Sequence, residues 1–347
     1  MSDTLCAISP GDRFAQAQMD RLLEAEGIRR DRCLDYSCGI FDENEVLIAT
    51  GSCFASTLRC LAVSQEHQGE GLLNRIIGHL VEVQLTRGNT HLFLYTKAGS
   101  AKFMTSLGFY EIARAGNDLV FMENRRNGFC SYCAALQKKR VEADRIAAIV
   151  MNANPFTLGH RYLVRRASEE NDVVHLFLLS EEAGPIPHAV RRKLAEEGTA
   201  EFPNVILHES GPYMISSATF PSYFLKDSDT VIRTQAALDL TVFSRIAQCL
   251  GIQRRYVGEE TSSHVTALYN EIMAARLPVL GMDCHIVPRL RADGGIISAS
   301  TVRQAIHDGR VEDIRGLVPE STYRYFTSPQ AEAVRAAIRN TPDIIHY

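Results

Sequence analysis

The sequence predicts an α/β protein of two domains, a mixed sheet followed by a parallel sheet, and three observations support this prediction. The chain has 347 residues, which is more than one domain of common size needs. Between residues 36 and 123, short β-rich runs follow one another with turn residues between them, as in antiparallel sheets. After residue 146, apolar strands alternate with helical patterns, which is typical of a parallel sheet covered on both faces.

Composition and charge exclude several classes of protein. Hydrophobic residues make up 46% of the chain and charged residues 22%, as in globular domains and unlike disordered chains. The net charge is −4 and neither half is basic, so we expect no nucleic-acid partner. Because no apolar run approaches a membrane span and no leader pattern opens the chain, we expect no membrane association. Nine cysteines without framework spacing favour reduced thiols and a cytoplasmic protein.

The first domain, residues 1–130, is predicted to be a mostly antiparallel sheet interrupted by two helices. Apolar residues recur at helical spacing from Gly71 to Arg87, and a shorter helix is expected from Ser100 to Leu107. The strands expected in this domain are residues 36–41, 46–54, 57–63, 91–96, 108–113 and 118–123.

Residues 131–142 are predicted to be a linker, because apolar periodicity gives way there to Arg, Lys, Asn and Gly. The second domain is then residues 143–347, with a helical C-terminal end. Its expected strands are residues 146–151, 173–179, 205–209, 254–258 and 284–290, and its expected helices are residues 159–170, 187–199, 234–250 and 264–276.

A loop after the first strand of the second domain has the features of an anion site. The strand 146–151 runs into a loop that ends in Thr157, Gly159 and His160, and a helix follows. Unpaired N–H groups and the helix dipole favour phosphate oxygens at such a helix start. Gly159 lets the backbone come close, His160 can donate a hydrogen bond and Thr157 offers a hydroxyl. The alternative is an ordinary helix start with a threonine cap and a surface histidine.

A second segment, Ile297 to Arg303, offers the same chemistry later in the chain. Ser298 and Ser300 can cap a helix and donate to phosphate, while Arg303 lies in the first turn as a fork for phosphate oxygens. The alternative is a serine-capped helix with a solvated arginine.

Together the two segments resemble the nucleotidyltransferase superfamily, whose members carry an H-x-G-H or T-x-G-H loop and a late I-S-x-(S/T)-x-(I/V)-R motif. Here Thr157 replaces the first histidine of many members. The resemblance implies a Rossmann-like domain in which four residues act in catalysis, namely His160, Thr157, Arg303 and Ser300. It also implies a nucleotide site formed by Asn152, Ala153, Asn154, Gly159, Arg191, Gly258 and Ser298, with Gly258 at a strand end that faces the adenine.

The first domain has a glycine-bearing loop of its own between a strand and a helix. Gln68, Gly69 and Gly71 could bind a pyrophosphate through backbone N–H groups. The domain resembles N-acetyltransferases of the GNAT type, which implies a site for coenzyme A or a similar arm. It departs from that pattern at Leu73, where those proteins carry a small residue, so an inactive or repurposed fold is the alternative.

The whole chain resembles the citrate lyase ligase family, including residues 152–163 and 216–226. The resemblance implies an acid–thiol ligase that forms AMP, with ATP and Mg²⁺ as cofactors and no protein metal site. Acetate would react with ATP to give acetyl-adenylate and pyrophosphate. The acetyl group would then pass to the thiol of a dephospho-coenzyme A type arm on the citrate lyase acyl carrier subunit, which activates citrate lyase.

Other functions remain open from the residues alone. An adenylyltransferase acting on a phosphopantetheine-like phosphate would use the same motifs, and a GNAT acetyltransferase would use acetyl-coenzyme A without ATP. A carrier-binding module without catalysis is a third possibility. The segment from Tyr213 to Lys226 is our prediction for the acetate pocket or the site of the arm, with core packing as its alternative.

Overall fold

The protein, seen in a computed structural model, is a mixed α/β chain that forms two compact units. The first unit comprises residues 1–132 with 219–242, and the second comprises residues 133–218 with 243–347. Helix α7 (Ser228–Leu250) therefore belongs partly to each. The structure describes residues 3–31, 33–180, 184–215, 228–259, 264–292 and 295–341.

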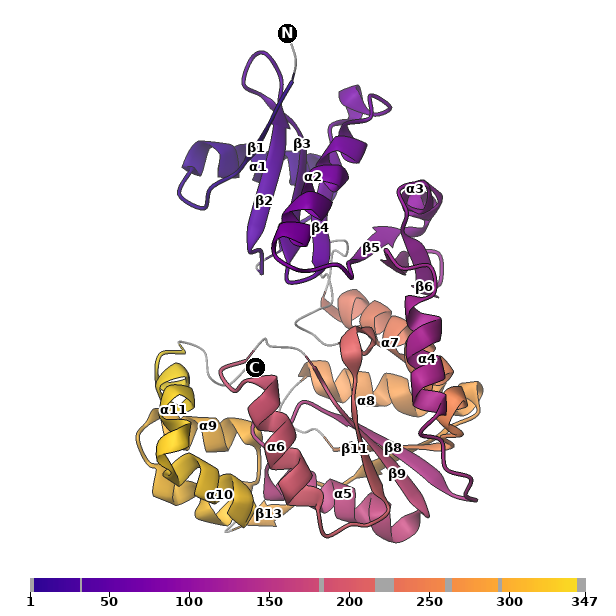
Figure 1. Cartoon of the computed structure of the whole chain (residues 1–347), viewed down its shortest axis with the longest axis vertical. Coiled ribbons are helices and arrows are strands. Elements are labelled where there is room, and N and C mark those ends of the chain that lie inside the picture. The colour runs from indigo at the N-terminus through magenta and orange to yellow at the C-terminus, as the bar shows by residue number, and fades with distance from the viewer. Residues whose placement is uncertain are drawn as a thin grey trace. The chain divides into compact units, whose positions relative to one another are not determined.

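The first unit is built on a seven-stranded mixed sheet (Figure 1). The strand order is β1-β2-β3-β4-β5-β7-β6, and every neighbouring pair is antiparallel except β4 and β5. The strands are β1 (Thr4–Ala7), β2 (Tyr36–Phe41), β3 (Leu47–Phe54), β4 (Thr57–Val63), β5 (Phe93–Lys97), β6 (Tyr110–Ala115) and β7 (Leu119–Glu123).

Helices cover both faces of this sheet. Leu47 packs in the cluster that contains α1 (Arg13–Ala25), whereas the next residue, Ile48, packs in the cluster that contains α2 (Leu72–Thr86). Since successive side chains of a strand point to opposite faces, α1 and α2 lie on opposite sides of the sheet. The short helix α3 (Ala101–Ser106) adds Ala101 and Met104 to the α2 side.

The parallel pair β4 and β5 stays together for only two residues. Thr57 is opposite Phe93 and Leu58 is opposite Leu94, and no further pair joins these two described strands although β4 continues to Val63. The two strands therefore separate toward their carboxyl ends.

The six predicted strands and two predicted helices of this unit are confirmed, with boundaries shifted by up to about two residues. Strand β1 and helix α1 were not predicted. The signal for α1 lay in Asp12, whose carboxylate accepts from the N–H groups of Phe14 at 3.1 Å and Ala15 at 3.0 Å and so caps the helix.

The segment expected to be a linker, residues 131–142, contains most of helix α4 (Gly128–Gln137), which begins in the expected first domain. The carboxylate of Glu123 accepts the Phe129 N–H at 2.7 Å, which places a negative group at the start of this helix. Phe129 and Leu136 are buried, so tertiary packing stabilises a stretch whose sequence has weak helical periodicity.

The second unit contains a five-stranded sheet whose neighbours are all parallel. The order is β10-β9-β8-β11-β12, with β8 (Ile146–Met151), β9 (Val173–Leu178), β10 (Val205–Glu209), β11 (Arg254–Gly258) and β12 (Asp283–Val287). The strand order reverses direction between β8 and β11, as in a Rossmann-like fold, and ligands of such sheets bind beyond the carboxyl ends at that point. The predicted parallel sheet is confirmed.

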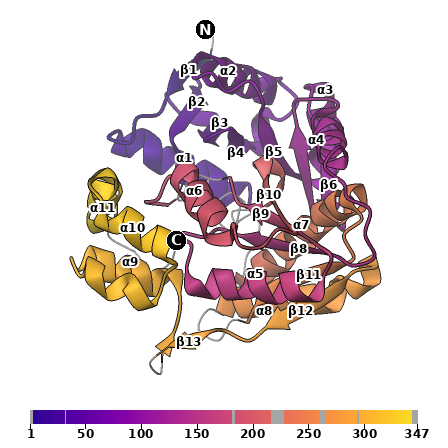
Figure 2. The same cartoon turned by 60° about the horizontal axis from the view of Figure 1, so that its bottom comes forward.

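Helices also cover both faces of the parallel sheet (Figure 2). Tyr256 of β11 packs in the core cluster with five helices, whereas its neighbour Arg255 lies on the other face, 4.2 Å from the ring of Phe243 in α7. The five helices are α5 (Leu158–Glu170), α6 (His188–Thr199), α9 (Ala299–His307), α10 (Glu320–Thr327) and α11 (Glu332–Arg339). Helix α8 (His264–Arg276) contacts β12, and a small hairpin joins β13 (Arg291–Ala292) to β14 (Gly295–Ile296).

The nine cysteines are free thiols. Among the helices that the structure describes, none is long and apolar enough to cross a membrane.

A buried histidine pair lies between β9 and β10. His175 and His208 are 0% and 2% exposed, and Nδ1 of His175 lies 2.8 Å from Nε2 of His208. Their other ring nitrogens have no hydrogen-bond partner. Burial lowers the pKa of His175 to about 4 and, together with the neighbouring His175 and Lys139, lowers the pKa of His208 to about 3. Both rings are therefore neutral at pH 7.

We expect the free energy of unfolding to fall as the pH is lowered from about 7 to about 5. In the unfolded chain these two histidines bind protons near pH 6.5, whereas the folded chain keeps both neutral until the pH falls to their lowered pKa values. The unfolded state thus binds more protons, and the loss approaches about 1.4 kcal/mol per pH unit for each histidine. Urea unfolding at several pH values measures this slope.

The matched control is the double variant His175→Leu with His208→Leu, which removes both titrating groups and fills their space with apolar side chains. Its unfolding free energy should depend less steeply on pH. If its unfolding free energy changed with pH as steeply as that of the unaltered chain, the pH dependence would not come from His175 and His208.

Candidate functional site

The loop after β8 and the start of α5 are fixed by a reciprocal pair of hydrogen bonds. The His160 N–H donates to Oγ1 of Thr157 at 3.3 Å, and the Thr157 N–H donates to Nδ1 of His160 at 3.0 Å. This is a capping box in which histidine takes the place usually held by Glu or Gln. The helix start that the sequence predicted as an anion site is therefore held in one conformation.

The same bonds determine which ring nitrogen of His160 carries the proton. Nδ1 accepts the Thr157 N–H and also lies 2.9 Å from its hydroxyl, so the neutral ring is protonated on Nε2. Burial, and to a smaller extent the positive charge of Arg289, lowers the pKa of His160 to about 4. At neutral pH the side chain is an uncharged donor through Nε2.

The second segment forms the capped start of α9. Oγ of Ser298 accepts the Thr301 N–H at 3.0 Å, and the Ser300 hydroxyl lies 3.0 Å from it. Both serine side chains are half-buried. Their hydroxyls and the first N–H groups of α9 are thus gathered at one helix N-terminus.

The two segments meet in space. A Cβ placed on Gly159 would lie 3.1 Å from the backbone oxygen of Ile297, so only glycine leaves room for this approach without displacing a neighbour. Ile297 is tied in turn to the loop after β12, because its N–H donates to the Leu290 oxygen at 3.1 Å. The T-x-G-H loop and the late motif therefore lie next to each other in the fold, and their contact with phosphate stays a prediction.

The two arginines singled out from the sequence are buried rather than solvated, each with 2% of its surface exposed. Nη1 of Arg303 donates to the backbone oxygen of Asn154 at 2.6 Å. Nη1 of Arg191 donates to the backbone oxygen of Asn152 at 2.9 Å, to its Oδ1 at 2.8 Å and to the Leu179 oxygen at 2.9 Å. The alternative of a solvated arginine is wrong at both positions, and direct contact with phosphate stays a prediction.

The remaining predicted residues also lie at the carboxyl edge of the parallel sheet. Ala153 has a positive φ of 50°, a backbone strain that non-glycine residues rarely carry. Asn154 is 4% exposed, its Oδ1 has no hydrogen-bond partner, and its amide nitrogen would be 2.3 Å from a Cβ on Gly184. Gly258 ends β11 and its oxygen accepts from Nδ2 of Asn270 at 2.9 Å.

Arg289 is a residue at this edge that the sequence reasoning missed. Its Nε donates to the backbone oxygen of Glu259 at 2.7 Å, which joins the loops after β12 and β11. Its charge acts on His160, whose pKa it lowers. The sequence placed residue 289 inside the expected strand 284–290, whereas β12 ends at Val287, so only the structure shows Arg289 just beyond the carboxyl end of a parallel strand.

Among the residues that the structure describes, no three His, Cys, Asp and Glu side chains come together as metal ligands would.

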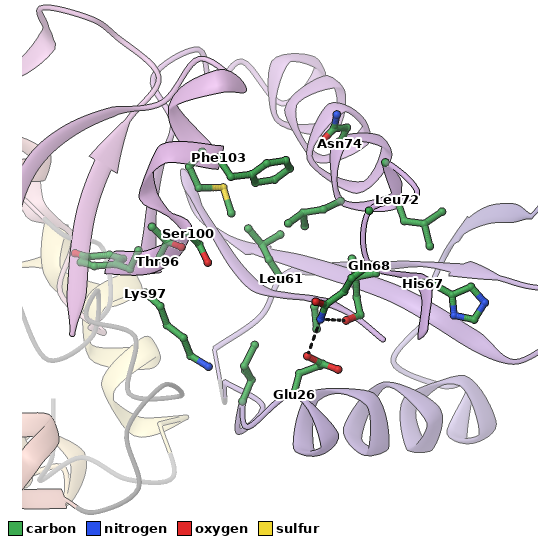
Figure 3. A pocket seen from close by; sticks show the side chains of 18 residues that line it. Glu26, Leu61, His67, Gln68, Leu72, Asn74, Thr96, Lys97, Ser100 and Phe103 are labelled. Carbon is green, nitrogen blue, oxygen red and sulfur yellow. Dashed lines mark hydrogen bonds between the residues drawn. The ribbon is translucent and has the colours of Figure 1, made fainter. Parts of the chain in front are cut away.

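The first unit holds a pocket of about 430 Å³ where β4 and β5 separate (Figure 3). Leu61, Leu72 and Phe103 form an apolar side, and Lys97 and Glu26 lie at its polar end.

The loop predicted to bind a coenzyme A type arm lines this pocket with all three of its residues, Gln68, Gly69 and Gly71. Nε2 of Gln68 lies 3.4 Å from a carboxylate oxygen of Glu26 and 3.4 Å from the Val63 oxygen. Gly69 and Gly71 have φ values of 93° and 76°, so a side chain at either position would strain the turn that leads into α2.

Comparison with known proteins identifies the family. The sequence model of the citrate lyase ligase C-terminal domain matches residues 146–326. A citrate (pro-3S)-lyase ligase of Haemophilus influenzae is 36% identical over 87% of this chain and 92% of its own. Those of Klebsiella pneumoniae and Escherichia coli K12 are 37% and 36% identical over 90% and 93% of this chain and 93% and 94% of their own. The chain belongs to the citrate lyase ligase family.

Two solved structures show partial similarity to this chain. A putative nicotinate-nucleotide adenylyltransferase from Vibrio parahaemolyticus covers 57% of this chain and 97% of its own, with 14% identity and a TM-score of 0.38. A putative acyl-CoA N-acyltransferase from Klebsiella pneumoniae covers 35% of this chain and 95% of its own, with 17% identity and a TM-score of 0.30.

The predicted acetate or arm segment, Tyr213 to Lys226, lies outside the described residues from residue 216 onward. Its first residues, Tyr213, Met214 and Ile215, are buried. The role of this segment in the family stays a prediction.

We expect His160→Ala to lower ligase turnover by about 10²-fold to 10³-fold, the loss typical when a donor to developing phosphate charge is removed. His160→Gln is the matched control for helix capping, because its amide oxygen can still accept the Thr157 N–H. Turnover assays and thermal melts of both variants test this. His160→Gln should keep the stability of the unaltered chain yet lose turnover, and unchanged turnover in His160→Ala would remove His160 from the site.

Proposed function

We propose that this chain is an ATP-dependent acid–thiol ligase that acetylates the acyl carrier subunit of citrate lyase and thereby activates that enzyme. The observation that carries the proposal is the approach of Gly159 to Ile297, which brings two helix N-termini with hydroxyl and imidazole donors to the carboxyl edge of a parallel sheet. Family membership and the names of the relatives support the choice of substrate.

The chemistry has two steps. In the first, a carboxylate oxygen of acetate attacks the α-phosphorus of ATP, the bond to the β-phosphate oxygen breaks, and pyrophosphate leaves with the electron pair. In the second, the thiolate of the carrier arm attacks the acetyl carbonyl carbon and AMP leaves. Acetate is a weak nucleophile, so the site must hold it in line with the α-phosphorus and stabilise the leaving charge.

The residues of the proposed site have two roles: some would donate hydrogen bonds to phosphate, and others would hold the loop after β8 in position. His160, through Nε2, and the hydroxyls of Thr157, Ser298 and Ser300 are proposed to donate to phosphate oxygens, together with the N–H groups at both helix starts. Arg303 and Arg191 are proposed to position the loop 152–154 through its backbone oxygens. Magnesium is proposed to enter with ATP and to be held by phosphate oxygens, since the described residues offer no cluster of ligands.

We further propose that the pocket of the first unit binds the dephospho-coenzyme A type arm of the carrier. Beyond Leu58 and Leu94 the facing edges of β4 and β5 have no strand partner within these described strands, and such edges can hydrogen-bond an extended ligand that carries amides. The loop from Gln68 to Gly71 at the start of α2 offers backbone N–H groups to its phosphates.

The proposed ligase should exchange labelled pyrophosphate into ATP only when acetate is present. This holds because the exchange needs the first step and its reversal, not the carrier. The purified protein is incubated with ATP, Mg²⁺ and labelled pyrophosphate, with and without acetate. The label that appears in ATP is then measured.

ATP binding without exchange, even after the carrier is added, would contradict acetate activation. It would favour adenylyl transfer to a phosphate ester, whose product is a dinucleotide rather than AMP. Acetylation of the carrier by acetyl-coenzyme A in the absence of ATP would instead indicate that the protein acts as a GNAT acetyltransferase.

A variant that fills the first-unit pocket should lose binding of the arm while keeping pyrophosphate exchange. Leu61→Trp places a large ring in the pocket, and Leu85→Trp, on the exposed side of α2, is the matched control. Calorimetry measures the dissociation constants of dephospho-coenzyme A and of coenzyme A, and shows which of the two the pocket binds more tightly. Equal binding by Leu61→Trp and Leu85→Trp would place the arm elsewhere.

A further inference from the structure

The groups assigned to phosphate in the proposed function are all uncharged, whereas the reaction needs positive charge near the leaving group; the inference here rests on that proposed function. Pyrophosphate leaves with several negative charges, which must be stabilised as they develop. His160 is uncharged at neutral pH. The guanidinium groups of Arg303 and Arg191 donate to backbone oxygens of the loop 152–154.

Arg289 lies at the carboxyl edge of the parallel sheet, near the proposed phosphate site. The Glu259 N–H donates to the Val287 oxygen at 2.8 Å, and Nε of Arg289 donates to the Glu259 oxygen at 2.7 Å. These two bonds join the loops that follow β11 and β12. The half-buried side chain is therefore held at the carboxyl edge of the sheet, on the β11 and β12 side of the switch point.

The backbone next to Arg289 is continuous with both phosphate segments. Leu290 accepts the Ile297 N–H at 3.1 Å, and the Ile297 oxygen abuts Gly159 at the start of α5. These contacts lead from Arg289 to the start of α5, where the guanidinium charge adds to burial in lowering the pKa of His160.

We propose that Arg289 binds the β- and γ-phosphate groups of ATP and stabilises pyrophosphate as it leaves. The planar guanidinium presents parallel N–H donors that match two phosphate oxygens, and it stays charged throughout. Arg289 transfers no proton. The electron pair of the broken bond goes to the bridging oxygen of pyrophosphate, whose charge the guanidinium balances.

The test compares Arg289→Gln with Arg291→Gln, a matched control that removes an exposed arginine two residues away. Calorimetry with inorganic pyrophosphate, ATP and AMP, each with Mg²⁺, gives the dissociation constants. Arg289→Gln should weaken pyrophosphate and ATP by about 10-fold to 100-fold and AMP by less than about twofold, because AMP lacks both outer phosphates. Arg291→Gln should bind all three as the unaltered chain does.

Two results would overturn the proposal. Unchanged binding of pyrophosphate by Arg289→Gln would show that the guanidinium does not contact the outer phosphates. Equal weakening of AMP and pyrophosphate would show that Arg289 merely supports the local fold through Glu259. Neither result depends on acetate, so a failure of acetate-dependent exchange in the unaltered chain is distinguishable from a failure of this inference.

Discussion

The approach of Gly159 to the Ile297 carbonyl is the contact on which the candidate site of the second unit depends. It brings the starts of α5 and α9 together although their motifs are far apart in sequence. Each helix start is fixed by its own cap, Thr157 in one case and Ser298 in the other. With the ends of both helices held, the hydroxyl, imidazole and backbone donors need no rearrangement to face a common ligand, which is the condition for electrostatic preorganisation.

The three arginines of this site differ in burial and in the loop that they contact. Arg191 and Arg303 are buried and reach backward to oxygens of the loop after β8, where positively charged donors stabilise a conformation that includes the strained Ala153. Arg289 is half-buried and donates to the Glu259 oxygen in the loop after β11. Burial and the loop that is contacted distinguish these arginines, although the residue type is the same.

The sequence allowed the parallel sheet to be predicted because its strands are short apolar runs such as residues 146–151, separated by amphipathic helices. The two capped helix starts could be predicted because their threonine, glycine, serine and histidine are residues typical of helix N-termini. Helix α4 could not, since its stability comes from burying Phe129 and Leu136 and from the Glu123 carboxylate rather than from its own periodicity. The orientation of Arg191 and Arg303 also depends on carbonyl groups whose positions only the folded chain defines.

The uncharged state of His160 has a consequence for what the site can discriminate. A charged side chain attracts any anion and its pull weakens as salt rises, whereas a neutral N–H selects by direction and is little affected by screening. Because Nδ1 is held by Thr157, the Nε2 proton points along one line that the ring cannot change without breaking the cap. In the proposed site, His160 would therefore select a ligand oxygen by its position, and other groups would respond to the total charge of the ligand.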